Sequence, residues 1–224
     1  GAEREYIQMN STITKLQTVD ELLDHANDRV DEMNVINLAT CMHRLGRLNA
    51  ARNRGAGGAA RDPAVVEDAR FQTLTNKLRE LLIAAQDGTL EGKGLGTFKV
   101  RPLSAICWGA AHCGLTTSSG DPMLSLVFKN IITHEEDSPP GQNVSNLLWA
   151  YASMHNSRET NKELMKKLEY WCECIMDDFA AQGVSNSLWA FATLGHTLRP
   201  EVVSLFSKAI KKNMKDFKSM EFSN

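Results

Sequence analysis

Apolar residues recur three and four positions apart along most of the chain, which is the spacing of one face of an α-helix. The clearest stripes are Leu164, Leu168, Trp171 and Ile175 in one segment and Val203, Phe206, Ile210 and Met214 in another. No segment alternates apolar and polar residues for long enough to predict a β-strand. The pattern therefore predicts an all-α fold.

Several predicted helices start with side chains that bond the first backbone N–H groups, or with a proline that suits the first helical position. The predicted starts are the Thr18–Glu21 capping box before 19–31, Asp62-Pro63, Asp121-Pro122, the Thr160–Glu163 capping box before 161–177, and Pro200 before 201–216. Each of these segments follows or precedes a copy of a repeated phrase. We interpret them as the second helices of helix pairs.

The repeated phrase reads VSNLLWAYASM at 144–154 and VSNSLWAFATL at 184–194. A third copy is LSAICWGAAHC at 103–113, a fourth and more diverged copy is VINLATCMHRL at 35–45, and the chain ends on the start of a fifth. The Asn position falls at 37, 105 (where it is Ala), 146, 186 and 224, so the spacings are 68, 41, 40 and 38 residues. A period near 40 is typical of two-helix solenoid repeats.

The longer first spacing indicates an insertion. Residues 49–61 (NAARNRGAGGAAR) have no apolar periodicity and are predicted to form a flexible loop. The chain is thus expected to be one helical-repeat array over residues 1–224, with about four repeats, and to belong to a longer protein.

The repeated phrase has two apolar faces. One stripe comprises Val144, Leu147, Leu148, Tyr151 and Met154. Trp149 lies roughly 100° around the helix from its neighbour in that stripe. We expect one face to pack on the partner helix and the other on the next repeat, which would bury Trp149 and the equivalent Trp108 and Trp189.

The charge balance does not favour nucleic acid over the chain as a whole. Lys and Arg number 25 and Asp and Glu number 27, which gives a net charge of −2 and a pI near 6.3. Positive charge is nevertheless clustered, because five arginines and no acidic residue lie between residues 33 and 61. A second cluster, Lys208, Lys211, Lys212 and Lys215, is either a solvated helix face or a phosphate contact.

Other chemistries find little support. The five cysteines are odd in number and lie mostly in apolar helical patterns, which indicates free thiols in a reducing compartment. Neither the cysteine nor the histidine spacing fits a zinc site, and no nucleophile, base or paired-carboxylate motif stands out, so we expect no enzyme, no metal and no cofactor. The longest apolar stretch, 103–115, is too short to span a membrane.

The phrases NLLWAYA (146–152), NSLWAFA (186–192) and NVINLATCMHRL (34–45) resemble the octotricopeptide repeats, and are similar to the repeats of FAST-kinase-like and RAP-domain proteins. The resemblance implies a right-handed superhelical solenoid of antiparallel helix pairs that binds single-stranded RNA sequence-selectively. It also implies a place in the mitochondrion or chloroplast, in transcript stabilisation, processing, splicing or translation. No RAP domain is present in these residues, and two repeats depart from the pattern at Ala105 and Thr40.

Helical-repeat proteins read RNA bases with two or three side chains at equivalent positions of each repeat. When the copies are aligned, the polar position that varies most between them holds Arg44, His112, Ser153 and Thr193. The next candidate position, the Asn column, holds Asn37, Asn146 and Asn186. Phosphate contacts are expected from Arg47, Arg52 and Arg54. The alternative for the Asn column is a hydrogen-bonded ladder between repeats, and the varied column fits drift at exposed positions equally well.

Two rival functions remain open. The chain fits a structural subunit of an organellar ribonucleoprotein such as the mitochondrial ribosome, with rRNA or other ribonucleoprotein subunits as partners. It also fits a protein-interaction solenoid of the armadillo or HEAT kind. Charge on the first helices discriminates the rivals, because an open face that is neutral or acidic would favour the protein scaffold.

Overall fold

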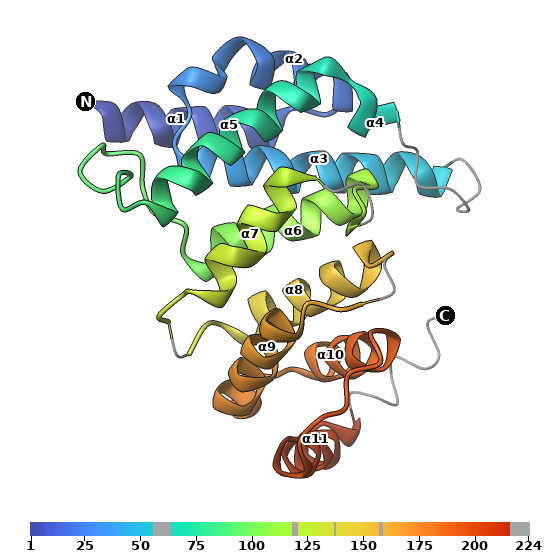
Figure 1. Ribbon diagram of the computed structural model, residues 1–224. Helices are drawn as coiled ribbons and strands as arrows, with labels where there is room; N and C mark the ends of the chain where they lie inside the picture. Colours follow the sequence, from blue (N-terminus) through green and yellow to red (C-terminus); the bar gives the residue numbers. More distant parts are fainter. Residues whose placement is uncertain (56–63, 118–120, 137, 157–158, 216–224) are drawn as a thin grey trace.

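The computed structural model describes residues 1–55, 64–117, 121–136, 138–156 and 159–215, with side chains at 53–55 left out (Figure 1). These residues form helices and connecting segments, and no strand occurs among them. The predicted all-α class is therefore confirmed for the described part of the chain.

The long helices pack in two layers. The first layer contains, in order, α1 (Ala2–Lys15), α3 (Val35–Gly55), α6 (Val100–Cys113), α8 (Gly141–Met154) and α10 (Ala181–Thr193), each in contact with the next. The second layer contains α2 (Val19–Arg29), α5 (Ala69–Gln86), α7 (Pro122–Ile132), α9 (Lys162–Ile175) and α11 (Pro200–Lys212), again with neighbours in contact. Shorter helices are η1 (Val30–Glu32), α4 (Ala64–Glu67) and η3 (Met176–Asp178). Figure 1 shows the chain advancing from α1 to α11 as it passes between the layers.

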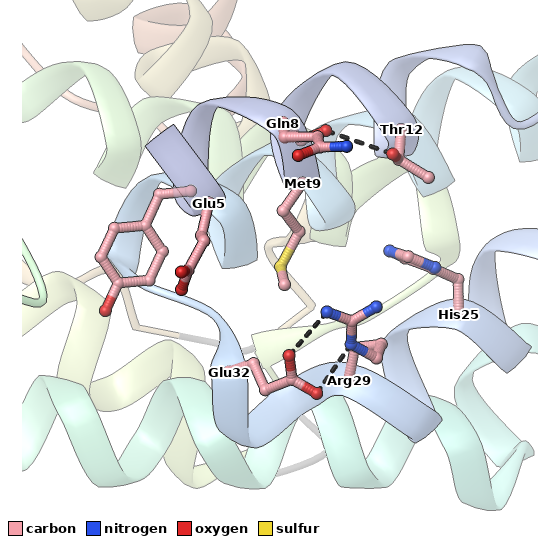
Figure 2. Close-up of a pocket in the computed structure, with 8 residues that line it drawn as sticks. Glu5, Gln8, Met9, Thr12, His25, Arg29 and Glu32 are labelled. Atoms are coloured by element: carbon pink, nitrogen blue, oxygen red, sulfur yellow. Dashed lines mark hydrogen bonds and ion pairs between the residues drawn. The ribbon is translucent and has the colours of Figure 1, made fainter. Parts of the chain in front are cut away.

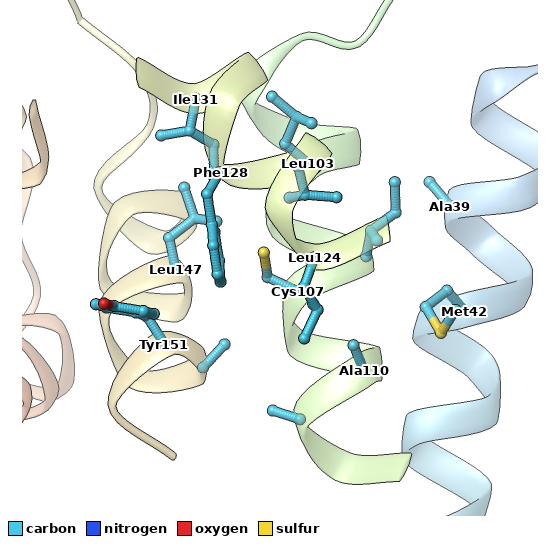
Figure 3. Close-up of a cluster of buried hydrophobic side chains, with 14 of the residues drawn as sticks. Ala39, Met42, Leu103, Cys107, Ala110, Leu124, Phe128, Ile131, Leu147 and Tyr151 are labelled. Carbon is cyan, nitrogen blue, oxygen red and sulfur yellow. The ribbon is translucent and has the colours of Figure 1, made fainter. Parts of the chain in front are cut away.

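The core lies between the two layers and between neighbouring helices of the first layer. Figure 3 shows one section of it, in which Cys107 of α6 lies among side chains of α7 and α8. Phe128 of α7 meets Tyr151 of α8 edge-on, with ring centroids 5.1 Å apart. Each large apolar side chain buried in this way contributes about 2 kcal/mol through the hydrophobic effect. The repeated phrase thus supplies core residues from its Leu and Tyr positions.

Glycine lets α3 and α6 approach closely. A Cβ added to Gly109 would lie 2.1 Å from the carbonyl oxygen of Met42, and one added to Gly46 would lie 2.7 Å from the Cα of Gly109. Both contacts are closer than real Cβ atoms show, so this crossing requires glycine. The backbones of the two helices are in direct contact here.

Most predicted helix starts are confirmed. Thr18 and Glu21 form the capping box of α2, and the Asp121 carboxylate accepts hydrogen bonds from the backbone N–H groups of Met123 and Leu124. Pro200 is the first residue of α11. The Asp62-Pro63 start lies outside the described residues.

The predicted cap of α9 is wrong by one residue. Asn161, rather than Thr160, caps the helix, because its side-chain oxygen accepts the backbone N–H of Leu164 at 3.0 Å. The backbone N–H of Asn161 is held in turn by the Tyr151 hydroxyl at 2.8 Å. That long-range bond fixes which of two adjacent polar residues becomes the cap.

The predicted loop over 49–61 is also partly wrong. The helix α3 continues to Gly55, and Asn49 is buried and donates its side-chain N–H to the carbonyl oxygen of His112 at 2.9 Å. Alanine and arginine are good helix formers, so contact with α6 is enough to extend the helix despite the missing apolar period. Residues 56–61 lie outside the described residues.

The predicted free thiols are confirmed. Cys41, Cys107, Cys113 and Cys172 are buried, and Cys174 is exposed on α9. Burial raises the pKa of Cys41, Cys107 and Cys113 to about 12, so these thiols stay protonated at neutral pH. Across the described helices, none combines the length and the apolar character needed to cross a bilayer.

Candidate functional site

Two adjoining cavities of about 600 and 400 Å³ lie over the first layer. Both are lined by His43, Trp108 and Asn146, so together they form one groove. The larger cavity extends to Asn10 and Thr14 of α1, and the smaller one to Gln182 and Asn186 of α10. The groove therefore crosses all five helices of the first layer.

Aromatic rings form a row in this groove. The Trp108 ring lies 4.7 Å from His43 of α3 and 4.0 Å from His112 on its own helix, measured between ring centroids. The His112 ring stacks on Trp149 of α8 at 4.7 Å, with an angle of 23° between the planes. Trp189 of α10 continues the series by its place in the repeat and is 47% exposed.

The expectation that the three repeated tryptophans are buried is wrong. Trp189 is exposed, and Trp108 and Trp149 are half-buried and line the groove. The small Ala positions let neighbouring helices pack without the indole rings between them: Ala110, Ala150 and Ala190 are fully buried. The fully buried tryptophan is Trp171 of α9 in the second layer.

Amide side chains accompany the rings. Gln142 and Gln182 stand one helical turn before Asn146 and Asn186, so the same pair occurs on α8 and on α10, and all four line the smaller cavity. The Gln142 amide N–H donates to the Asn146 amide oxygen at 3.1 Å. Each amide offers both donors and acceptors, which can match the edges of planar polar molecules.

Four of the five helices that the groove crosses carry no acidic residue, and the fifth, α1, has Glu3 and Glu5. The sequences of α3, α6, α8 and α10 contain no Asp or Glu, although the whole chain has 27. Arg47 of α3 and Arg101 of α6 are exposed and line the groove. Burial lowers the pKa of His43, and the nearby Arg47 and Arg44 lower it further, which favours its neutral ring. The groove is thus cationic within a chain of net charge −2.

Two of the predicted site residues are engaged within the fold. Arg44 donates from its guanidinium to the carbonyl oxygen of Leu16 at 2.8 and 3.2 Å. Asn37 is 1% exposed and donates to the carbonyl oxygen of Tyr6 and the side-chain oxygen of Asn10, at 2.9 and 3.0 Å. These bonds tie α3 to α1 and to the segment after it, as the ladder alternative for the Asn column describes.

Some of the other predicted residues line the groove and others lie outside it. Asn146, Asn186 and Arg47 line the cavities, whereas His112, Ser153 and Thr193 do not. His112 instead contacts the rings beside the groove. Arg52 is exposed near the end of α3, and the side chain of Arg54 lies outside the described residues.

Two repeated features of the groove were missed by reasoning from the sequence. One is the Gln at 142 and 182, which recurs at the repeat period four residues before the Asn. The other is the absence of acidic residues from every copy of the phrase, which is visible in the sequence once the copies are aligned. Both features are the same in every copy concerned, so a search for positions that differ between copies does not detect them.

A separate cavity of about 510 Å³ lies between α1 and α2. Figure 2 shows Gln8 and Met9 of α1 facing His25 and Arg29 across it. Glu32 makes a two-point ion pair with Arg29 at 2.6 and 2.7 Å, which neutralises the arginine. The cavity has no aromatic row and contains two carboxylates of its own, so it differs in chemistry from the groove.

Within the described ranges, no three His, Cys, Asp or Glu side chains come together as a metal site would require. No protein-family model, no curated protein and no solved structure matches this chain. Function is therefore inferred from the residues of the groove.

Proposed function

We propose that this chain is a right-handed superhelical solenoid whose groove binds single-stranded RNA sequence-selectively. The groove over α3, α6, α8 and α10 is where the strand lies. The observation that carries this proposal is the row of accessible aromatic rings in a groove in which α3, α6, α8 and α10 have no carboxylate. Rings, amides and arginines together are the groups that bind bases and phosphates.

The energetics favour an unpaired strand. A base stacked on an aromatic side chain contributes about 1 to 3 kcal/mol, but only a base that has left its own stack can reach the ring. The rings here line the groove at a spacing set by helix packing, so a flexible strand can place successive bases on them. A duplex buries its base faces and would offer the groove only its backbone.

Charge placement supports RNA over the protein-scaffold alternative. Arg47 and Arg101 lie in the groove, and α3, α6, α8 and α10 supply no carboxylate to repel phosphate. Carboxylates along these helices would repel each phosphate of a bound strand and weaken its binding. The role in a mitochondrion or chloroplast, as a binder of transcripts or rRNA, is a proposal supported by the repeat resemblance.

The test is a titration of the protein with a single-stranded RNA of about 12 nucleotides of mixed sequence and with its duplex, at about 50 to 200 mM salt. We expect the single strand to bind more tightly, and its affinity to fall steeply as salt rises. The Arg101→Gln variant should weaken binding and reduce the slope of log K against log salt by about 1. The matched control is Lys208→Gln on α11 in the second layer, which should leave both values unchanged.

A protein scaffold would behave differently in the same experiment. It would show no affinity for the single strand that depends on salt, and Arg101→Gln and Lys208→Gln would be indistinguishable. That result would overturn the RNA proposal. Selection from a random RNA pool then measures sequence selectivity, because an enriched motif is expected and an unenriched pool would contradict it.

A further inference from the structure

The first layer contains two intervals between equivalent tryptophans, and they are filled differently. Trp108, Trp149 and Trp189 occupy the same position of successive phrases, at spacings of 41 and 40 residues. In the first interval, between α6 and α8, the ring of His112 contacts both Trp108 and Trp149. The three rings form a closed cluster, in which the two tryptophan centroids are 6.5 Å apart.

The second interval, between α8 and α10, has a small side chain where the first has an imidazole. Ser153 stands four residues after Trp149, as His112 stands four residues after Trp108. Trp189 is 47% exposed, and among the described residues no ring stacks on it. The interval thus has the two tryptophans but lacks the planar group that joins them.

Hydrogen-bonding groups lie beside Trp149, one turn or more before it on the helices. Gln142, Asn146, Gln182 and Asn186 line a cavity with Trp149, whereas Trp189 and Ser153 do not line that cavity. The Gln142 amide N–H donates to the Asn146 amide oxygen. Among the described residues, the Gln142 amide oxygen and the Asn146 amide N–H make no other hydrogen bond, so both can bond a ligand. A donor and an acceptor side by side are what the edge of a nucleobase recognises.

We propose that a nucleobase occupies, between Trp149 and Trp189, the place that the His112 ring occupies between Trp108 and Trp149. The first interval is closed by the protein's own ring, and the second is the base-stacking site. This inference rests on the proposed RNA function and assigns the position of one base within it. The ligand chemistry is a nucleobase, from a strand or from a free nucleotide.

The first experiment fills the proposed site with a histidine ring, as His112 fills the first interval. Ser153→His should place an imidazole between Trp149 and Trp189 and weaken binding of an oligoadenylate of about eight nucleotides by about tenfold. The matched control is Ser207→His, the same change on an exposed turn of α11 in the second layer, which should leave the affinity unchanged. Trp189→Ala, at a position that is 47% exposed, should weaken binding by a similar factor.

The second experiment opens the closed interval. His112→Ser should vacate the space between Trp108 and Trp149 and strengthen oligoadenylate binding several-fold, provided that the thermal midpoint shows a folded protein. If His112 instead contacts RNA directly, the same variant weakens binding. Quenching of tryptophan fluorescence by oligoadenylate should be reduced in Ser153→His and increased in His112→Ser.

The outcomes separate this inference from the proposed function. If wild type binds the strand but Ser153→His and Trp189→Ala bind it equally well, the base site is wrong and RNA binding stands. If wild type binds no single strand, both proposals fail. Adenosine monophosphate is titrated in parallel: tighter binding of the strand than of the nucleotide supports a site for RNA, whereas equal affinities would assign the site to a free nucleotide and overturn the assignment to a strand.

Discussion

The two layers of the molecule use the same kinds of residue in opposite ways. In the first layer tryptophans are accessible and acidic residues are missing from α3, α6, α8 and α10. In the second layer Trp171 is fully buried and its indole N–H donates to the carbonyl oxygen of Glu136 at 2.7 Å. A tryptophan at helical spacing is therefore a core residue in one layer and a surface ring in the other.

Acidic residues differ between the second layer, which contains many, and α3, α6, α8 and α10, which contain none. Arg70 of α5 bonds the carboxylates of Asp20, Asp24 and Asp68, all within or beside the second layer. Asp20 and Asp24 are largely exposed, so their pairs with Arg70 contribute little to stability individually. Carboxylates of the second layer thus lie among basic residues, whereas α3 and α6 carry arginines and no carboxylate.

The largest expected effect comes from removing the buried indole. Trp171→Ala should lower the free energy of unfolding by about 3 to 5 kcal/mol, because it leaves a cavity and an unsatisfied carbonyl group. Trp189→Ala should change it by less than about 0.5 kcal/mol. Urea unfolding followed by circular dichroism measures both. Equal losses in the two variants would erase the distinction between the layers.

A smaller loss is expected where the first layer packs most tightly. Gly109→Ala should destabilise the fold by about 3 kcal/mol, since its methyl group would overlap the Met42 carbonyl oxygen and force α3 and α6 apart. Gly1→Ala is the control, because a Cβ there meets no atom within 4 Å. A Gly109→Ala protein as stable as wild type would show that the contact between α3 and α6 is looser than described.

The smallest of the three effects concerns a buried carboxylate in the second layer. Glu169 of α9 is 4% exposed and accepts the backbone N–H of Arg199 and a ring N–H of His196, each at 2.8 Å. Burial alone would raise its pKa, but these two donors outweigh burial and the pKa is lowered below its ordinary value of 4.5. Glu169→Gln should therefore cost about 2 kcal/mol at neutral pH.

The pH dependence of that loss has a definite sign. A carboxyl group with a lowered pKa in the folded state stabilises the fold above the pKa of the unfolded chain, and that contribution is lost as pH falls through the folded value. The difference in stability between wild type and Glu169→Gln should therefore be largest above pH 4.5 and should shrink as the pH falls further below that value. A difference that stays constant with pH would show that the carboxylate charge is not involved.

Local chemistry let the sequence predict much of the fold. The capping box at Thr18 and Glu21 and the Asp121-Pro122 start were predictable because the bonds that make a helix start join residues two or three apart. Asn161 was not, since the bond that selects it comes from Tyr151 across a turn. The end of α3 was not either, because contact with α6 extends the helix beyond its apolar pattern.

The groove was only partly predictable for the same physical reason. Periodicity shows that the repeated phrase has two apolar faces, but it does not show which face a neighbour covers. The structure covers the Leu and Tyr face and leaves the Trp face in the groove. The engagement of Arg44 by the Leu16 carbonyl group likewise depends on a contact between segments 28 residues apart.

The position of the cysteines makes the protein straightforward to label. Four thiols are buried, and those of Cys41, Cys107 and Cys113 keep their protons at neutral pH. Only Cys174 is exposed, on α9 in the second layer, so a maleimide dye should attach there once per molecule. The dye would sit on the face opposite the aromatic row, and the natural sequence thus provides a fluorescent reporter that leaves the groove unobstructed.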